Sequence, residues 1–346
     1  MLAARMYGVN DIRIEEVPTP VIGDNEVLLK VKAAAVCGTD VRMLSFGANG
    51  IDEDHPLILG HEFAGEIAEL GKNVAGYALG QRVAVAPNMG CSHCDMCVSG
   101  NSHLCGDYKA LGVNLDGGFA QYVLIPEAAV RGGNITPLAD TVSFEDGALN
   151  EPFSCVLNGS ERCRIEPGDT VLIVGAGVIG LMHAKLAKLQ GAGKVVISDL
   201  SGERLAQCNE IDSDLVTVGA LDADLVKSLT NGRGFDVIIT ACPSPAAQQL
   251  SFEQAAVNGR ICFFGGLPKD RENISLNSNA IHYKQLIVTG TTRSSLEQYR
   301  KTLRFIETGI ADVSGLVTKW APLEKLPELI ELAKAAKGLK NLVLFD

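Results

Sequence analysis

Two patterns of apolar positions divide this 346-residue chain near residue 150. In the first part, residues 26–36 (EVLLKVKAAAV) alternate apolar and polar side chains as a half-buried strand does, and residues 82–86 and 119–125 read similarly. Glycine and proline interrupt these segments often, as turns between short strands require. The first 150 residues are therefore predicted to be rich in β-strands.

From residue 169 onward, continuous apolar strands alternate with helices. Predicted strands occupy residues 170–174, 194–198, 235–240 and 260–264, and a predicted helix at 178–190 ends before Gly191. Wholly apolar strands separated by helices indicate a parallel sheet covered on both faces. The regularity fades after about residue 290, where we expect the tail to return to the first domain. The fold class is thus α/β, with a doubly wound parallel sheet beside a β-rich domain.

Composition narrows the classes of function. The net charge of −11 leaves no basic excess for nucleic acid or anionic membranes, so neither is an expected partner. The most apolar stretch, at residues 171–184, contains three glycines and is too short to span a bilayer. Ten cysteines without a recognisable export signal indicate reduced thiols and predict a cytoplasmic location.

Four of these cysteines form a compact motif with the spacing C-x2-C-x2-C-x7-C. Four thiols so close in sequence can surround one tetrahedral Zn²⁺ and leave no open position, which predicts a structural zinc. Residues 91–105, which contain the motif, are called the four-cysteine lobe. His93 and His103 lie inside this lobe and are expected to be exposed, because four thiols already complete the tetrahedron around the metal. The predicted ligands are Cys91, Cys94, Cys97 and Cys105.

A glycine-rich turn follows the strand at 170–174 and begins the helix at 178–190, which is the context that a dinucleotide-binding motif needs. Gly175 permits the tight turn, Gly177 lets the backbone approach a pyrophosphate, and Gly180 lets the helix pack closely on the strand. The helix N-terminus offers free N–H groups to the phosphates. The full G-x-G-x-x-G motif is Gly175-Ala176-Gly177-Val178-Ile179-Gly180.

Asp199 ends the next predicted strand and is placed to accept hydrogen bonds from the ribose hydroxyls of the adenosine half. A carboxylate at this position repels a 2′-phosphate, so the predicted cofactor is NAD rather than NADP. Two observations leave alternatives open. Asp199 would also cap a helix starting at Ser201, and Arg204 could instead accept a 2′-phosphate.

A second, dispersed metal site is suggested by Cys37, His61, Glu62 and Glu151. Thiolate, imidazole and carboxylate together suit Zn²⁺, and three protein ligands leave a position for substrate or water. Because these residues are far apart in sequence, spacing alone leaves the alternative of a buried small thiol and solvated carboxylates.

The chain resembles the zinc-dependent medium-chain dehydrogenases, and within them the sorbitol (polyol) dehydrogenase branch. The resemblance rests on segments that occur in the family's order along nearly the whole chain. It implies a GroES-like catalytic domain made of residues 1–150 and 291–346, which carries both zinc sites. A Rossmann NAD-binding domain at 151–290 is implied as well, with the active site in the cleft between the two. The segments are CGTD, GHEFAGEIAELG, the four-cysteine lobe, EDGALNEP, GAGVIG and ISDLSGERL.

The resemblance also implies roles for single residues. Cys37, His61 and Glu62 would hold a catalytic zinc, with Glu151 in or beside its coordination shell. Thr39 matches the hydroxyl that starts the family's proton relay, although it could also be the N-cap of the helix that follows.

Two arginines depart from a simple transfer of the family's roles. Arg42 occupies the position of a relay histidine in many relatives and cannot act as a base at neutral pH, so the proton would leave through the ribose hydroxyl. Arg293 resembles an arginine that reaches the substrate pocket, and it could equally be a surface residue before a helix at 296–307.

The resemblance implies NAD-dependent oxidation of a secondary alcohol of a polyol to a ketose, with two zinc ions per chain, one catalytic and one structural. Three alternatives remain: a polyol phosphate as substrate, L-threonine 3-dehydrogenase activity suggested by CGTD and GVNLDGGFAQY, and a catalytically inactive relative. Family members form homodimers or homotetramers by pairing their Rossmann sheets, which would place the edge at residues 260–267 and 286–291.

Overall fold

The computed structural model describes all 346 residues and divides into two compact units. Unit 1 comprises residues 1–154 and 293–346, and unit 2 comprises residues 155–292. The C-terminal segment thus belongs to the same unit as the N-terminus.

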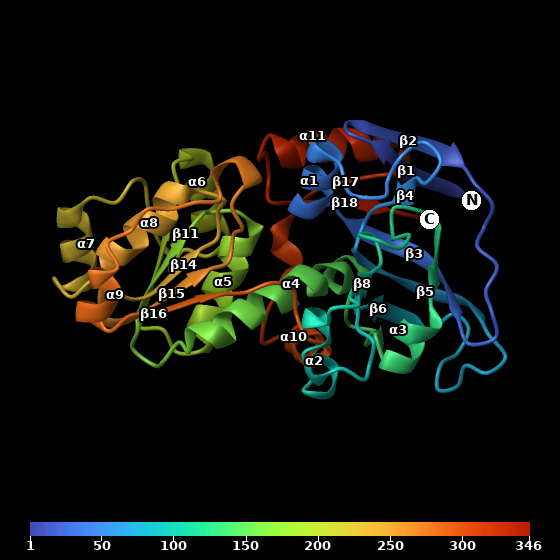
Figure 1. The fold of residues 1–346 in the computed structure, drawn as a ribbon, viewed down its shortest axis with the longest axis horizontal. Coiled ribbons are helices and arrows are strands. Elements are labelled where there is room, and N and C mark those ends of the chain that lie inside the picture. Colours follow the sequence, from blue (N-terminus) through green and yellow to red (C-terminus); the bar gives the residue numbers. More distant parts are fainter. The chain divides into compact units, whose positions relative to one another are not determined.

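The central strand of unit 1 is β3 (Val27–Ala35), the segment in which an alternating strand is predicted. One edge of β3 pairs with β5 (Glu62–Leu70), and its other edge is shared by β9 (Tyr122–Ile125) and the C-terminal β18 (Lys340–Leu344). The sheet runs in the order β10-β6-β5-β3-β18-β17, with β9 branching from β3 (Figure 1). This pairing brings residues from both ends of the chain to one strand.

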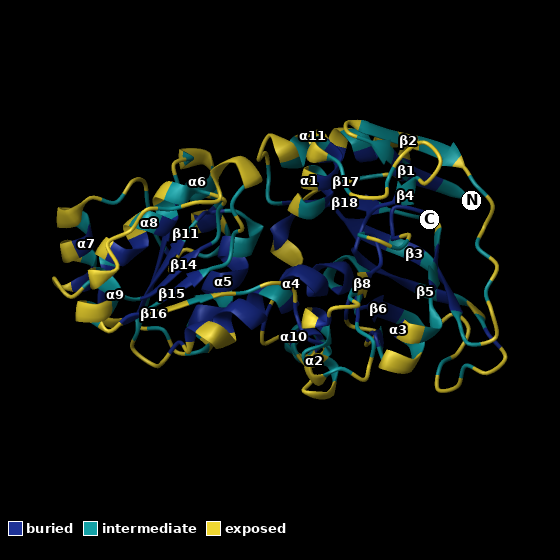
Figure 2. Ribbon diagram, viewed as in Figure 1, coloured by how far each residue is buried: buried dark blue, intermediate teal, exposed yellow.

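The other strands of unit 1 complete that sheet and form two smaller ones, β2-β1-β4 and β7-β8. Strand β3 has the sequence VLLKVKAAA, in which the valines, leucines and alanines are buried and the two lysines are partly buried (Figure 2). These strands are β1 (Leu2–Gly8), β2 (Asp11–Glu16), β4 (Leu57–Ile58), β6 (Arg82–Val85), β7 (Asn88–Met89), β8 (Lys109–Ala110), β10 (Ile135–Pro137) and β17 (Val317–Ala321).

Helices cover this sheet and carry its connections. The longest, α4 (Phe144–Cys163), begins in unit 1 and ends in unit 2, and it contains Pro152 in its interior. The others in unit 1 are α1 (Gly38–Phe46), α2 (Asp95–Val98), α3 (Glu127–Gly132), α10 (Leu296–Glu307) and α11 (Leu326–Lys334), with short 3-10 turns at Ser102–Leu104, Ser314–Leu316 and Leu323–Lys325.

Unit 2 is built on a six-stranded sheet in the order β13-β12-β11-β14-β15-β16, and every strand pair is parallel. The predicted doubly wound parallel sheet is therefore confirmed. Its order reverses between β11 and β14, which is where ligands bind in open α/β sheets. The strands are β11 (Thr170–Val174), β12 (Lys194–Ser198), β13 (Val216–Val218), β14 (Phe235–Thr240), β15 (Ala255–Phe263) and β16 (Ile287–Gly290).

The helices of unit 2 follow the strands in alternation. Helix α5 contacts β11 and β12, and α8 contacts β14 and β15. No helix in the structure is long and apolar enough to cross a membrane, because the apolar stretch at 171–184 is divided between a strand and a helix. The helices are α5 (Val178–Leu189), α6 (Gly202–Ile211), α7 (Ala223–Thr230), α8 (Pro245–Gln254), α9 (Asn279–Lys284) and a 3-10 turn at Lys269–Arg271.

One titratable side chain lies in the core of unit 2 without a polar partner. His183 of α5 is fully buried, and neither ring nitrogen makes a hydrogen bond. Its ring packs edge-on against Phe264, with 4.7 Å between the ring centres. Burial lowers the pKa of His183 to about 3, because a charged imidazolium would lose its hydration there.

We expect His183 to make the protein labile to acid. In the unfolded chain its pKa is about 6.5, so below that pH the unfolded state binds a proton that the folded state refuses, and stability falls as the pH drops towards 3. Between pH 6.5 and pH 5 the loss should reach about 2 kcal/mol, at about 1.4 kcal/mol per pH unit. The variant His183→Leu should lose less stability than the wild type between pH 7 and pH 5. Urea unfolding followed by circular dichroism would measure this, and equal losses in both proteins would contradict it.

Candidate functional site

Cys37 lies in the short connection between β3 and α1. Its backbone is extended (φ −103°, ψ 154°) and it is the N-cap of α1, so the alternative of Thr39 as the N-cap is wrong. The backbone N–H of Cys37 donates a hydrogen bond to Oδ2 of Asp40 at 2.8 Å. Helix α1 therefore fixes Cys37 through a residue of its own first turn.

Strand pairing then brings two further candidates to Cys37. Ala35 at the end of β3 is opposite Glu62 at the start of β5. As a result, the Sγ of Cys37, a ring nitrogen of His61 and a carboxylate oxygen of Glu62 all lie within 4.8 Å of one another. His61 is 6% exposed and Glu62 is 0% exposed. Three residues predicted from sequence to hold a catalytic metal are thus collected at one sheet end, in a donor set that suits Zn²⁺.

Asp40 also lies beside the imidazole of His61. The Asp40 side chain is fully buried, and its Oδ1 lies 3.5 Å from Nδ1 of His61. Burial alone would lower the pKa of His61, but the negative charges of Cys37 and then Asp40 outweigh it and raise that pKa well above its usual value. Nδ1 of His61 makes no hydrogen bond, so Asp40 acts on the ring through its charge.

A buried lysine neutralises Glu62. Nζ of Lys340, on β18, lies 2.7 Å from Oε1 and 2.5 Å from Oε2 of Glu62. Burial by itself would lower the pKa of Lys340, but the charge of Glu62, and then those of Cys37 and Glu151, hold it above its usual value. Lys340 therefore stays charged within a group of anionic side chains.

Glu151 lies on α4, immediately before Pro152, and is 7% exposed. It does not belong to the group whose donor atoms lie within 4.8 Å of one another, although its charge acts on Lys340. The geometry places Glu151 beside the three-residue cluster rather than in it.

Thr39, whose hydroxyl is predicted to start a proton relay, lies one helical turn before Arg42 on α1. Thr39 is half-buried, and its Oγ1 accepts a long hydrogen bond of 3.4 Å from the exposed Arg42. A guanidinium at this distance donates to the hydroxyl and cannot take a proton from it.

The four predicted zinc-binding cysteines converge at a second cluster in unit 1. All four Sγ atoms lie within 4.8 Å of one another, and those of Cys94 and Cys105 are 3.7 Å apart. Sulfur atoms at the corners of a tetrahedron with Zn–S bonds of ~2.3 Å would be about 3.8 Å apart, so the geometry fits the metal. Backbone N–H groups of His93 and then Cys94 lower the pKa of Cys91 to about 6, which favours the thiolate that a metal binds.

The two histidines of this lobe differ in exposure. His93 is exposed as expected, but the expectation was wrong for His103, which is 2% exposed. The 3-10 turn at Ser102–Leu104 directs it inward. Its carbonyl accepts a 2.8 Å hydrogen bond from Nη1 of Arg293, and the guanidinium carbon of Arg293 lies 3.6 Å from the ring centre of Tyr108. The predicted substrate residue Arg293 is thus engaged by the four-cysteine lobe.

In unit 2, the predicted glycine motif forms the turn between β11 and α5. Gly175 has φ +119°, which L-residues rarely adopt, and a Cβ on Gly180 would lie 1.9 Å from the carbonyl oxygen of Gly175. A Cβ on Gly177 would instead meet only Nη1 of Arg204, at 3.7 Å. Backbone geometry therefore requires glycine at positions 175 and 180. At Gly177 the open space instead fits the close approach of a pyrophosphate. The N-terminal residues of α5 are Val178 and Ile179.

The carboxylate of Asp199 accepts two backbone hydrogen bonds and can still accept hydrogen bonds from a ribose. Its Oδ2 accepts from the N–H of Ala176 at 2.7 Å, and its Oδ1 accepts from the N–H of Ser201 at 2.8 Å. Ser201 in turn is the N-cap of α6, so Asp199 ties the glycine turn to that helix. Each carboxylate oxygen keeps a further lone pair for a ligand hydroxyl.

The contrast between two glycines gives a prediction. Gly177→Val should leave stability within about 1 kcal/mol of the wild type, because φ at this position is −86° and the added side chain meets open space. It should nevertheless abolish measurable binding of the dinucleotide. Gly180→Ala should destabilise the fold, because its Cβ overlaps a backbone oxygen. Thermal unfolding with and without NADH would separate the two effects. Equal loss of stability in both variants would contradict the assignment.

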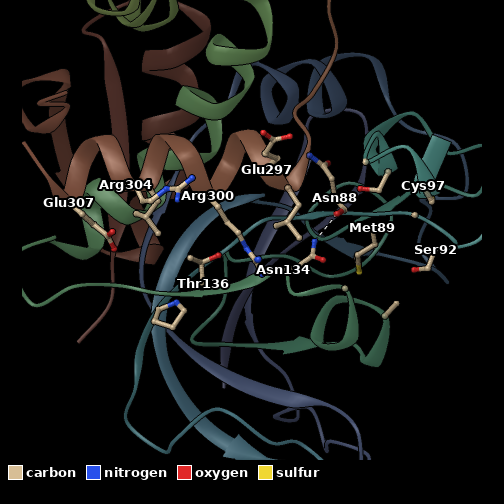
Figure 3. Close-up of a pocket in the computed structure, with 18 residues that line it drawn as sticks. Asn88, Met89, Ser92, Cys97, Asn134, Thr136, Glu297, Arg300, Arg304 and Glu307 are labelled. Carbon is tan, nitrogen blue, oxygen red and sulfur yellow. Dashed lines mark hydrogen bonds between the residues drawn. The ribbon is translucent and has the colours of Figure 1, made fainter. Parts of the chain in front are cut away.

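A cavity of about 760 Å³ in unit 1 lies apart from the Cys37 cluster, and Figure 3 shows it between the four-cysteine lobe, β10 and α10. Helix α10 contributes side chains of both signs to its wall, namely Glu297, Arg300, Arg304 and Glu307. The charges balance, and we assign no ligand to this cavity.

Two residues of the metal cluster were missed from the sequence. Asp40 could have been found, since it stands in the first turn of a helix that starts after Cys37. Lys340 left no signal, because it is 278 positions from its partner Glu62.

Comparison with known proteins identifies the family of this chain. Residues 23–132 match the model of the alcohol dehydrogenase GroES-like domain, and residues 178–308 match that of the zinc-binding dehydrogenase family. The sorbitol dehydrogenase of Bacillus subtilis (strain 168) is 35% identical over 342 residues, which is 98% of this chain and 95% of that protein. The L-threonine 3-dehydrogenase of Rhizobium rhizogenes is 33% identical over 331 residues, 94% of this chain and 93% of that protein.

Solved structures agree over the whole chain. A zinc-binding dehydrogenase from Sinorhizobium meliloti 1021, bound to NADP, has a TM-score of 0.88 and 30% identity and covers 99% of both chains. An alcohol dehydrogenase from Escherichia coli CFT073, complexed with NADH, has a TM-score of 0.89 and 26% identity and covers 100% of this chain and 99% of that one. The predicted resemblance and fold class are confirmed: the chain is an alcohol or polyol oxidoreductase of the zinc-dependent medium-chain dehydrogenase family, in its sorbitol dehydrogenase-like branch.

Proposed function

We propose that this protein is an NAD-dependent dehydrogenase that uses a catalytic zinc to oxidise a secondary alcohol of a polyol to a ketose. The observation that carries the proposal is the convergence of Cys37, His61 and Glu62 within 4.8 Å, beside a separate cluster of four cysteines. Two zinc ions per chain follow, one catalytic and one structural. The similarity to a sorbitol dehydrogenase over 98% of the chain supports the substrate class.

Each residue in and around the Cys37 cluster has a different role. Cys37 and His61 would hold the metal with Glu62, Asp40 places a negative charge beside His61, and Lys340 balances the charge of Glu62. When bound, zinc acts as a Lewis acid that lowers the pKa of a substrate hydroxyl, and NAD accepts the hydride.

The proton of the alcohol needs a path of its own. The hydroxyl of Thr39 can accept the alcohol proton, and Arg42 stays cationic beside it. We propose that the proton then leaves through the ribose hydroxyl, since the relay has no histidine at position 42.

NAD is proposed over NADP because Asp199 places a carboxylate at the end of β12. Arg204 is the feature that would favour the phosphorylated cofactor, and relatives have been solved with each. The ratio of kcat/KM for the two cofactors decides this point; a higher value for NADP would reverse it.

One exposed strand edge and the state of the cysteines support proposals on assembly and location. The edge strand β16 exposes Ile287 and Val288, at 46% and 37%, which supports pairing with a second copy in a homodimer or homotetramer. None of the ten cysteines forms a disulfide, which is in keeping with a reducing compartment such as the cytoplasm.

The test is formation of NADH across a panel of free polyols, polyol phosphates, L-threonine and simple alcohols, with zinc content measured on the same preparation. Turnover on one polyol, lost on removal of the metal by a chelator, is the expected result. Activity restricted to L-threonine would establish the second candidate, which the relative at 33% identity supports. Cofactor binding without any turnover, together with a single zinc per chain, would favour a non-catalytic relative.

A further inference from the structure

Arg293 connects the four-cysteine lobe to the segment that precedes α10. Its backbone has φ +56°, which costs a non-glycine residue on the order of 1 kcal/mol and persists only where contacts enforce it. Those contacts are the carbonyl of His103 and the ring of Tyr108, both of which belong to the lobe or follow it directly. Tyr108 is itself fixed, because its hydroxyl donates to Oδ1 of Asn88 at 2.6 Å. The lobe therefore holds Arg293 in a conformation that it would not adopt alone.

The next residue transmits this constraint to α4. Ser294 is 4% exposed, and its Oγ lies 2.6 Å from Oγ of the fully buried Ser154. Ser154 donates its single hydroxyl hydrogen to the carbonyl of Glu151 at 2.6 Å. Since that hydrogen is committed, Ser294 is the donor to Ser154. A directed chain of hydrogen bonds thus runs from Ser294 to the backbone of Glu151.

The backbone at Glu151 needs such support. Pro152 follows it inside α4, has no N–H to donate, and disfavours the helical conformation of the residue before it. A second tie comes from the same direction: Nδ2 of Asn150 donates to the carbonyl of Tyr299 at 2.9 Å. Residues 294–299 therefore hold α4 on both sides of Glu151.

We propose that Arg293 is a positioning residue that couples the folded four-cysteine lobe to the carboxylate of Glu151, and through it to the metal cluster of Cys37. Loading of the lobe with zinc then sets the position of Glu151 beside that cluster. The inference rests on the proposed function, because it takes the cluster of Cys37, His61 and Glu62 as the catalytic metal site and Glu151 as its neighbour.

The experiment uses the full-length protein with the lobe loaded with Zn²⁺ and the Cys37 cluster titrated with Co²⁺, whose visible absorption reports its ligands. The variant Arg293→Asn removes the guanidinium but keeps a residue that tolerates positive φ. It should weaken Co²⁺ binding by about tenfold and shift the absorption bands, as loss of an outer support for a ligand does. The matched control is Arg300→Asn on α10. It also removes a hydrogen bond from an arginine to a backbone carbonyl, because Nη2 of Arg300 donates to the carbonyl of Gly133 at 2.6 Å.

Ser294→Ala cuts the chain of hydrogen bonds while leaving the contact between Arg293 and the lobe intact, so it covers the case in which Arg293→Asn fails to fold. It should change the Co²⁺ spectrum in the same direction. A spectrum unchanged by Ser294→Ala, or equal effects of Arg293→Asn and Arg300→Asn, would overturn the coupling.

Glu151→Gln separates the coupling from the proposed function. If Glu151→Gln weakens Co²⁺ binding but neither Arg293→Asn nor Ser294→Ala does, the coupling is wrong and the catalytic site stands. If the wild-type protein binds no Co²⁺ outside the lobe, the proposed function fails, and the coupling fails with it.

Discussion

Lys340→Met should destabilise the metal-free protein by about 3–5 kcal/mol, because it leaves the carboxylate of Glu62 buried without a counter-charge. Glu62 is 0% exposed and Lys340 is 4% exposed, so water cannot replace the lost ammonium. Zinc should restore part of the loss, since a divalent cation beside Glu62 supplies the missing positive charge. Urea unfolding with and without added Zn²⁺ would measure both quantities.

A matched control exists at the surface of the same unit. Lys325 and Glu328 also approach to 2.5 Å, but their side chains are 56% and 67% exposed. Lys325→Met should therefore cost at most about 1 kcal/mol. The double variant Glu62→Gln with Lys340→Met should recover most of the lost stability, because no unpaired charge remains. If Lys340→Met costs no more than Lys325→Met, the buried pair does not neutralise Glu62 as described.

Cys37→Ser should lower kcat/KM at least about a thousandfold, since a Lewis-acidic metal contributes several kcal/mol to the transition state. Zinc content should fall from two ions per chain to one. The fold should remain intact, because Cys37 is the N-cap of α1 and serine is a preferred residue there. Activity, metal analysis and thermal unfolding on one preparation would test all three statements.

The opposite behaviour is expected at the other metal site. Cys97→Ser should also remove one zinc, but it should lower stability, because a structural zinc contributes its binding energy to folding. Full turnover and two zinc ions in Cys37→Ser would contradict the catalytic assignment of the Cys37 cluster.

Local patterns in the sequence were sufficient for much of this molecule. The parallel sheet of unit 2 follows from continuous apolar strands, and the glycine turn is determined by short-range sterics that any chain with this motif must satisfy. The four cysteines lie within fifteen positions, so their convergence requires only a short loop. The resemblance to the dehydrogenase family rested on such segments taken together and in order.

Other features depended on contacts between distant segments. Thr39 was a reasonable N-cap by composition, but the turn after β3 places Cys37 there instead. His103 was expected in solvent, and the 3-10 turn buries it. The sequence left Arg293 either as a substrate residue or as a surface residue before a helix, and the structure adds its hydrogen bond to the carbonyl of His103.

The sequence by itself determined the fold class, the glycine turn after β11 and the four-cysteine motif, because each depends on neighbours along the chain. Only the tertiary structure decided which charged side chains lie next to the cluster of Cys37, His61 and Glu62. Lys340 reaches Glu62 because the last strand of the chain pairs with β3, beside the start of β5. No local pattern can encode such a pair, since its geometry depends on which strands become neighbours in the folded sheet.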